Sequence, residues 1–228
     1  MLVLALETSG DVGSAAVRLP DGTVVERGFP EGTSHGTGLL PACEALLEET
    51  GHAVSEVELV AVSLGPGSFT GLRVGVAAAK GLAFGLGCDV LGVSTLDVLA
   101  WNAVGLREGA VAPVLDARRG HAHAALYSVG PDAIIRQSED LVVPPDRLIA
   151  RLERPVTLLG DGVRRYPDAF AGFDDVLPED AWRARAAVVA EIAARDHAAG
   201  RRDALHDLEP RYNRISTPEA RLAGDDSG

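Results

Sequence analysis

Two short acidic segments, far apart in the sequence, carry the residue types best suited to phosphate or metal chemistry. The first holds two carboxylates, two hydroxyls and a glycine: Glu7, Thr8, Ser9, Gly10 and Asp11. The second centres on Asp116 and continues with Arg118 and Arg119. Carboxylates can bind Mg²⁺, and a glycine lets backbone N–H groups approach an anion. The same residues also satisfy the donors of an ordinary polar hairpin, so both interpretations stay open.

Other catalytic motifs are excluded by their spacing. The segment Gly65–Gly71 lacks the Gly-Lys-Ser/Thr ending of a P-loop, and its third glycine falls one position late for a dinucleotide fingerprint. No two of the six histidines are four residues apart, so no helical pair could hold a metal. His121 and His123 share one face of a strand, and we expect them to be exposed and non-ligating. Neither Ser9 nor Ser68 lies in a Gly-x-Ser-x-Gly elbow.

Composition limits the class of protein. The 228 residues are 46% hydrophobic and 24% charged, which excludes disorder for the bulk of the chain. The 21 basic and 33 acidic residues leave a net charge of −12, which argues against tight nucleic-acid binding by this chain alone. Cys43 and Cys88 are too few for a disulfide framework. We expect a cytoplasmic, membrane-free protein, since no secretory signal or uncharged stretch of about 20 residues is present.

The first hundred residues predict a meander of three strands followed by alternating helices and strands. The expected strands are 2–6, 14–19, 23–27, 59–64 and 90–93. The expected helices are 38–50, 71–86 and 94 to about 104. The last of these begins with the sequence Ser94-Thr95-Leu96-Asp97, which has the pattern of a capping box.

The pattern then restarts, which indicates a duplicated fold. An expected strand at 111–115 ends in Asp116, turns at Gly120 and continues as a strand at 121–129, as the strand before Glu7 turns at Gly13. Later elements are expected at 145–152, 156–159 and 184–199, with a turn at 160–162. We therefore expect lobes at 1–105 and 106–200 and a C-terminal segment at 201–228, whose last dozen residues are predicted to fray.

The helix expected at 71–86 has an unusual surface. Arg73 and Lys80 are its only polar residues and are seven apart, so they share one line of the helix. The pairs Gly71–Gly75 and Gly81–Gly85 leave two ridges with little bulk, against which another helix could pack closely. Either this is a central core helix, or one side packs on the sheet and another meets a partner beside the helix at 38–50.

Four blocks resemble the TsaB (YeaZ) family of bacterial tRNA threonylcarbamoyladenosine biosynthesis proteins. They are LALETSGDVGSAAV, SLGPGSFTGLRVGVAAAKGLAFG, GVSTLDVLA and VLDARRGHAHAALY, in that order. The resemblance covers residues 1 to about 127, and 209–214 is similar to the family's Pro-x-Tyr-x-Arg ending. The most specific part is GPGSFTGLRVG. One departure is Glu7, where many members carry Asp.

The resemblance implies a mixed α/β fold of the actin and sugar-kinase superfamily, with two lobes that each carry an acidic phosphate hairpin. It implies a non-catalytic subunit without a required cofactor. Such a subunit pairs with a TsaD-type catalytic subunit, which holds a metal through a His-x-x-x-His motif absent here, and with a TsaE-type ATPase. It would form a homodimer when alone and meet tRNA only through the complex. Any ATP or ADP would bind at a degenerate hairpin site or at the interface with the catalytic subunit.

The resemblance also places the partner interface on the helices at 38–50 and 71–86. The interface residues implied are Leu39, Leu40, Cys43, Leu47, Gly71, Arg73, Gly75, Ala79 and Leu82. On this hypothesis, Gly75→Leu would separate the partners and leave the monomer folded. One enzyme alternative is an ATP-dependent phosphotransferase that uses Glu7, Asp11 and Asp116 around Mg²⁺. A second is a peptidase M22-like metalloenzyme, which the histidine spacing disfavours.

Overall fold

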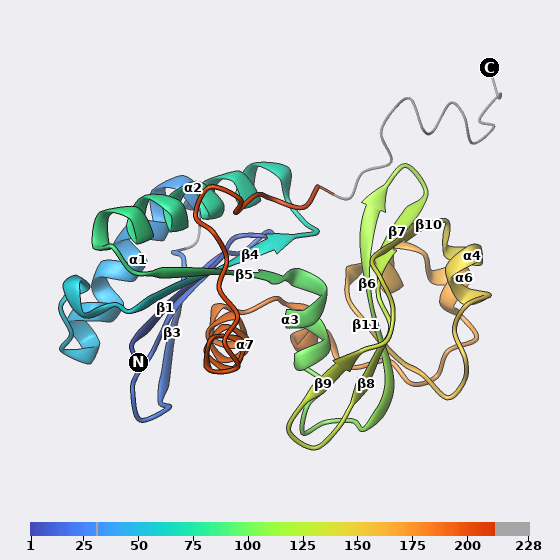
Figure 1. Cartoon of the computed structure of the whole chain (residues 1–228). Helices are drawn as coiled ribbons and strands as arrows, with labels where there is room; N and C mark the ends of the chain where they lie inside the picture. The colour runs from blue at the N-terminus through green and yellow to red at the C-terminus, as the bar shows by residue number, and fades with distance from the viewer. Residues whose placement is uncertain (31, 213–228) are drawn as a thin grey trace.

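The chain folds into two lobes, each built on its own β-sheet (Figure 1). The computed structural model describes residues 1–30 and 32–212. Within that range four clusters of buried hydrophobic residues form the core, two on the faces of the first sheet and two in the second lobe and at its junction with the first.

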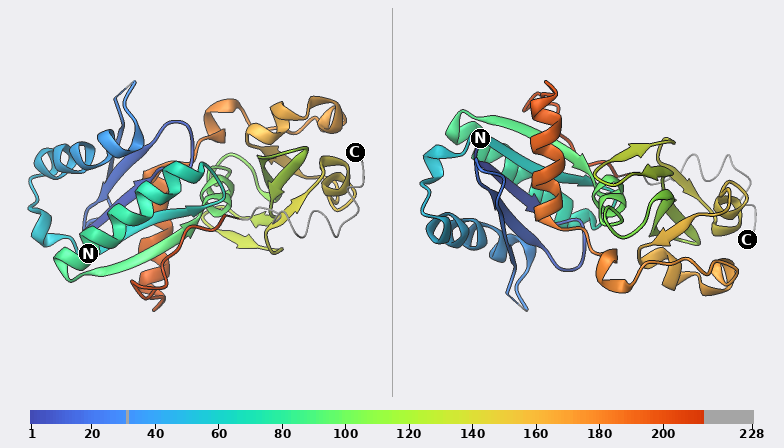
Figure 2. Two further views of the ribbon diagram at one scale, coloured as in Figure 1. Left: turned by 90° about the horizontal axis from the view of Figure 1, so that it is seen from above. Right: turned by 90° about the horizontal axis from the view of Figure 1, so that it is seen from below.

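The first lobe is a three-layered sandwich. Its strands are β1 (Val3–Glu7), β2 (Ser14–Arg18), β3 (Val24–Gly28), β4 (Leu59–Gly65) and β5 (Asp89–Ser94), in the order β3-β2-β1-β4-β5. The helices α1 (His35–Thr50) and α2 (Phe69–Leu86) cover one face, and α7 (Ala186–Ala198) crosses the other (Figure 2). Because both faces are covered, every residue of β1 and β4 is buried, as continuous apolar strands require.

The second lobe repeats the strand arrangement of the first. Its strands are β6 (Gly109–Arg118), β7 (His121–Ala124), β8 (Tyr127–Val129), β9 (Ile134–Arg136), β10 (Leu141–Val143) and β11 (Thr157–Leu159). β6 pairs antiparallel with β7 and parallel with β11, and β10 lies beyond β7. β1 makes the same pairs with β2 and β4, and β3 lies beyond β2. The duplication inferred from the sequence is therefore confirmed, as is the mixed α/β fold with two lobes.

The remaining elements are short. The helices α4 (Pro145–Ile149), α5 (Asp161–Arg165) and α6 (Pro167–Phe170) belong to the second lobe, and α3 (Thr95–Trp101) lies between the lobes (Figure 1). Two 3₁₀ turns are η1 (Val54–Glu56) and η2 (Glu179–Trp182). The strand expected at 121–129 is interrupted at residues 125 and 126, where the Leu126 N–H donates to Ser138 Oγ instead of to a neighbouring strand.

The C-terminal part returns to the first lobe, which differs from the expected boundary at residue 200. α7 packs on β1 and β2 because its buried alanine and valine face fits the small side chains there, including Ala5 and Ala16. Residues 201–212, named here the C-terminal strap, then pass the edge strand β5 and run along α2 (Figure 1). The predicted fraying and residues 213–214 of the family-like ending lie outside the described residues.

Candidate functional site

A cleft of about 890 Å³ separates the lobes, and both acidic hairpins line it. Ser9, Gly10 and Asp11 come from the first hairpin, and Asp116 and Arg118 from the second. The hairpins meet there because each follows the central strand of its own lobe, and the two strands end at the same opening. The structure thus brings together the two segments that the sequence singled out.

Glu7 and Thr8, however, lie inside the first lobe and not on the cleft. Both are fully buried. The Glu7 carboxyl group accepts hydrogen bonds from the N–H and hydroxyl of Ser9, both at 2.5 Å, and from the Ser63 hydroxyl. Burial raises the pKa of Glu7 above its ordinary value of 4.5, and these hydrogen bonds offset part of the shift. The expectation that these two residues contact a nucleotide is therefore wrong: Glu7 joins β1 to β4 instead.

Asp116 reaches the cleft, but its carboxylate is already engaged. Its side chain is 6% exposed and accepts hydrogen bonds from Tyr166 Oη at 2.8 Å and from the Arg118 N–H at 2.9 Å. Its second oxygen lies 3.2 Å from the Arg118 guanidinium and 3.7 Å from that of Arg165. Burial and the contact with Asp116 raise the pKa of Tyr166 to about 12. Little of this carboxylate is left to bind a cation.

The turn at 160–162 has a packing role. A Cβ at Gly160 would lie 2.3 Å from the Val114 carbonyl oxygen, and one at Gly162 would lie 2.7 Å from a Val114 methyl, so these glycines let α5 approach β6. Between them, Asp161 accepts the Asp116 N–H at 3.1 Å, and burial raises its pKa. The turn therefore ties α5 to the second hairpin.

These contacts do not fit a magnesium–nucleotide site. Of the three carboxylates proposed to surround Mg²⁺, Glu7 is internal, Asp116 is engaged, and only Asp11 is exposed at the cleft. No group of three His, Cys, Asp or Glu side chains in the described residues is arranged to hold a metal ion. His123, expected to be exposed, is 8% exposed and lines the cleft.

The glycines of α2 that were predicted to meet a partner instead face the chain's own first hairpin. A Cβ at Gly71 would lie 2.0 Å from the Thr8 carbonyl oxygen, and one at Gly75 would lie 2.2 Å from Thr8 Oγ1. Both glycines are buried. A close backbone approach does depend on them, but it joins α2 to the end of β1 rather than to another protein.

The other predicted interface residues divide between core and surface. Leu39, Cys43, Leu47 and Ala79 are buried in the first lobe, and Leu82 is partly buried. Leu40 and Arg73 are exposed, Leu40 by 54%. The two helices therefore use most of the predicted residues to pack on the sheet.

An apolar surface remains on the outer side of α2. It is formed by the exposed residues Ala77, Gly81 and Phe84 of α2, and is named here the outer face. Phe84 is 79% exposed, and no atom lies within 4 Å of a Cβ placed at Gly81. Phe84 was missed in the sequence, although it lies three helical turns after the exposed Arg73 and so on the same line. By length and composition α2 could cross a membrane, but in this fold its opposite side packs on β4.

The two charged residues of α2 contact the C-terminal strap. Lys80 Nζ donates to the carbonyl oxygens of His206 at 3.3 Å and Leu208 at 3.2 Å. Arg73 Nε donates to Tyr212 Oη at 3.0 Å. The strap thus contacts Arg73 and Lys80, while Phe84, which follows them near the C-terminal end of α2, stays exposed.

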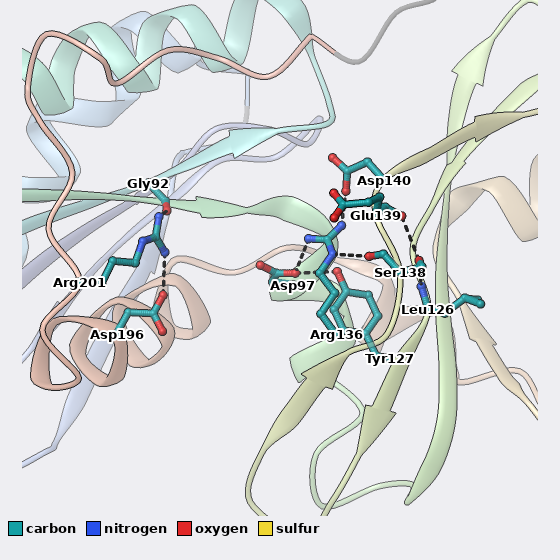
Figure 3. Close-up of polar contacts among 10 residues, drawn as sticks. All are labelled: Gly92, Asp97, Leu126, Tyr127, Arg136, Ser138, Glu139, Asp140, Asp196 and Arg201. Carbon is teal, nitrogen blue, oxygen red and sulfur yellow. Dashed lines mark hydrogen bonds and ion pairs between the residues drawn. The ribbon is translucent and has the colours of Figure 1, made fainter.

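A polar network joins α3 to the second lobe (Figure 3). Asp97 of α3 accepts hydrogen bonds from Tyr127 Oη at 2.6 Å and from Arg136 at 2.9 Å, and Arg136 also pairs with Asp140. Burial raises the pKa of Asp97. The helix begins where the capping-box pattern predicted, but its N-cap makes no side-chain hydrogen bond, and the Asp97 carboxylate binds the second lobe instead.

Comparisons with known proteins match nearly the whole chain. A family model described as "TsaD: tRNA N6-adenosine threonylcarbamoyltransferase" matches residues 30–160. The tRNA threonylcarbamoyladenosine biosynthesis protein TsaB of Escherichia coli is 30% identical over 232 residues, which cover 98% of this chain and 99% of that protein. The TsaB protein of Bacillus subtilis is 29% identical over 236 residues, 97% of each chain.

A solved structure shows the same architecture. YeaZ from Pseudomonas aeruginosa superposes with a TM-score of 0.81 at 28% sequence identity, over 92% of this chain and 99% of that one. Both lobes and their connection are therefore shared with this relative.

Proposed function

This chain belongs to the TsaB (YeaZ) family of tRNA threonylcarbamoyladenosine biosynthesis proteins, and from that premise we propose that it is the non-catalytic subunit that binds and activates a TsaD-type catalytic subunit. The observation that carries the proposal is the outer face: a largely exposed phenylalanine on a helix whose opposite side packs on β4 and whose two charged residues contact the strap. An exposed aromatic residue beside small residues is typical of an interface anchor.

Burial of Phe84 against a partner would contribute to the binding free energy through the hydrophobic effect. Burial of a whole Phe side chain contributes about 1.5–3 kcal/mol, and Phe84 is 79% exposed in the free subunit. The glycine at position 81 lets a partner backbone approach, so that the ring can be enclosed rather than merely touched. One residue can therefore supply a large share of the binding free energy.

The proposed non-catalytic role is supported by the hydrogen bonds that the carboxylates at and near the cleft already make. Two of the three carboxylates that a phosphotransferase would direct at Mg²⁺ are already engaged: Glu7 by Ser9 and Ser63, and Asp116 by Tyr166. The subunit would then work in the cytoplasm, form a homodimer when alone, join a TsaE-type ATPase through the complex and contact tRNA only indirectly. It would require no cofactor of its own, and any ATP or ADP would bind at the interface with the catalytic subunit.

The test is the affinity for the purified TsaD-type subunit encoded by the same genome, measured by isothermal titration calorimetry. We expect Phe84→Asp to weaken binding by about 100-fold or more, because a charge would replace the anchor. Ile135→Asp is a matched control, since Ile135 is 64% exposed on the second lobe, away from α2. Equal affinities of the two variants would contradict the proposed interface.

The competing hypothesis, an ATP-dependent phosphotransferase, rests on the cleft and on the exposure of Asp11. It predicts ATP hydrolysis by the purified chain that is lost in Asp116→Asn. We expect no hydrolysis above background from either protein. Hydrolysis at ordinary enzymatic rates that depends on Asp116 would overturn the non-catalytic assignment.

A further inference from the structure

The strand β5 forms one edge of the first sheet, and side chains of the C-terminal strap cover its outer side. β5 comes last in the order of the strands and pairs, within the described residues, with β4 alone. The Gly92 N–H donates to Asp203 Oδ2 at 2.8 Å. The Gly92 carbonyl oxygen accepts a hydrogen bond from Arg201 at 2.6 Å (Figure 3). Arg201 and Asp203, named here the edge cap, thus occupy both backbone groups that Gly92 directs away from β4.

The edge cap replaces a neighbouring strand without being one. Residues 201–212 form no strand, yet the cap supplies Gly92 with one acceptor and one donor, as an adjacent strand would. Its two members are held together, because the Arg201 guanidinium lies 3.0 Å from the Asp203 carboxylate and 2.7 Å from that of Asp196 on α7. Further along the strap, Leu208 is 3% exposed in the core of the first lobe and anchors the segment.

The other sheet edges are protected by other means. β3, at the opposite edge of the first sheet, includes the charged residues Glu26 and Arg27. In the second lobe, the edge strands β9 and β10 have three residues each. Charges and short length are common ways to prevent an edge from pairing with another chain. β5 has six residues, and its first, Asp89, is its only charged residue. Its protection therefore depends on the cap.

We propose that the edge cap is an autoinhibitory contact: it keeps β5 from adding a strand, and the strand that a released β5 would add is β5 of a second copy. In an antiparallel pair, two residues that face each other exchange both N–H···O bonds. Gly92 presents both groups on one side, so a twofold axis can bond the Gly92 residues of two copies to each other. The cap and the second copy compete for the same two atoms. This edge is a different surface from the outer face, which belongs to α2.

Removal of the cap is the direct test. Arg201→Ala/Asp203→Ala deletes one positive and one negative charge and so leaves the net charge unchanged. The parent and every variant also carry Phe84→Asp, which removes the apolar anchor of the outer face, so that association through α2 does not contribute. Hydrogen exchange of the Gly92 amide is followed by NMR at two protein concentrations about 100-fold apart.

The expected result depends on concentration. In dilute solution the Gly92 amide of the uncapped variant should exchange at least about tenfold faster than in the parent, because its N–H has lost its acceptor. In concentrated solution its exchange should slow again, and analytical ultracentrifugation should show a dimer, because mass action pairs the freed edges. The parent should exchange slowly at both concentrations.

Two further variants separate the cap from a general loss of stability. Arg164→Ala/Glu179→Ala removes an ion pair of 3.1 Å on the second lobe, also without a change in net charge, and should behave as the parent does. Asp203→Asn keeps an oxygen that can accept the Gly92 N–H and should stay close to the parent. Circular dichroism checks that each variant is folded, and the single variant Asp203→Ala replaces the double variant if that one unfolds.

Two outcomes would overturn the proposal. In the first, the Gly92 amide exchanges equally slowly in the capped and uncapped proteins in dilute solution, which would mean that the strap side chains do not protect it. In the second, the uncapped protein exchanges rapidly at both concentrations and stays monomeric, which would mean that the open edge does not add a strand. Neither measurement involves the TsaD-type subunit, so both results are independent of the proposed function.

Discussion

Two glycine-to-alanine substitutions in α2 should have opposite effects on stability. In Gly81→Ala the new methyl group meets no atom within 4 Å. In Gly75→Ala it would lie 2.2 Å from Thr8 Oγ1, which is 1.2 Å less than an ordinary contact of about 3.4 Å. Thr8 is fully buried and cannot turn its side chain into solvent. The helix must therefore shift away from β1.

The magnitude follows from two terms. Replacement of Gly by Ala inside a helix stabilises by about 0.8–1 kcal/mol, and this gain is common to both variants. Overpacking of a buried site costs about 1–3 kcal/mol and applies only at Gly75. The difference between the variants isolates the contact with Thr8 and should be about 1–3 kcal/mol. In a chain of this size, 1 kcal/mol corresponds to about 2–4 °C in melting temperature.

The assay is thermal and urea unfolding followed by circular dichroism. We expect Gly81→Ala to melt above the wild-type protein, and Gly75→Ala to melt below Gly81→Ala by at least about 2 °C. Gly75→Leu should lose the native fold, in contrast to the sequence-based expectation that the monomer stays folded. If the two alanine variants melt at the same temperature, α2 does not pack on Thr8 as described.

Two further predictions concern buried charge and the strap. The raised pKa of Glu7 means that the folded state binds this proton more tightly than the unfolded state, so the free energy of unfolding should fall as pH rises above about 4.5, by about 1.4 kcal/mol for each unit by which the pKa is raised. Urea unfolding from pH 4.5 to 7.5 should show this slope reduced in Glu7→Gln, and an unchanged slope would refute the assignment. Lys80→Met should free the strap and accelerate tryptic cleavage after Arg211 about tenfold, as followed by mass spectrometry. Lys80→Arg should restore slow cleavage, and equal rates in all three proteins would show that Lys80 does not hold the strap.

Local patterns predicted most of the architecture. The apolar runs before Glu7 and Asp116, each followed by a tight turn and a small-residue strand, indicated the duplicated unit that β1–β4 and β6–β11 form. The helices at 38–50 and 71–86 were predicted because their apolar spacing is regular over several turns. Such features depend on residues close in sequence, which is why they could be recognised.

The tertiary contacts that individual side chains make could not be predicted in the same way. The pattern of Asp97 is that of a helix cap, yet Tyr127 and Arg136, which lie 30 and 39 residues away, use its carboxylate. The alanine-rich α7 follows the second lobe in sequence, but its buried face fits the first sheet. Both outcomes depend on contacts between distant segments.

The sequence by itself determined the repeated hairpins, the helices and the family resemblance, because each depends on residue types at short separations along the chain. Only the tertiary structure decided what the small residues and the charges do. Gly71 and Gly75 pack on Thr8, Glu7 lies inside the first lobe, and Lys80 contacts the strap. Of the surface predicted for a partner, only the outer face around Phe84 is therefore left. The physical reason is that a glycine or a carboxylate specifies how close a neighbour can come or which donor it needs, but not which segment of the chain will supply it.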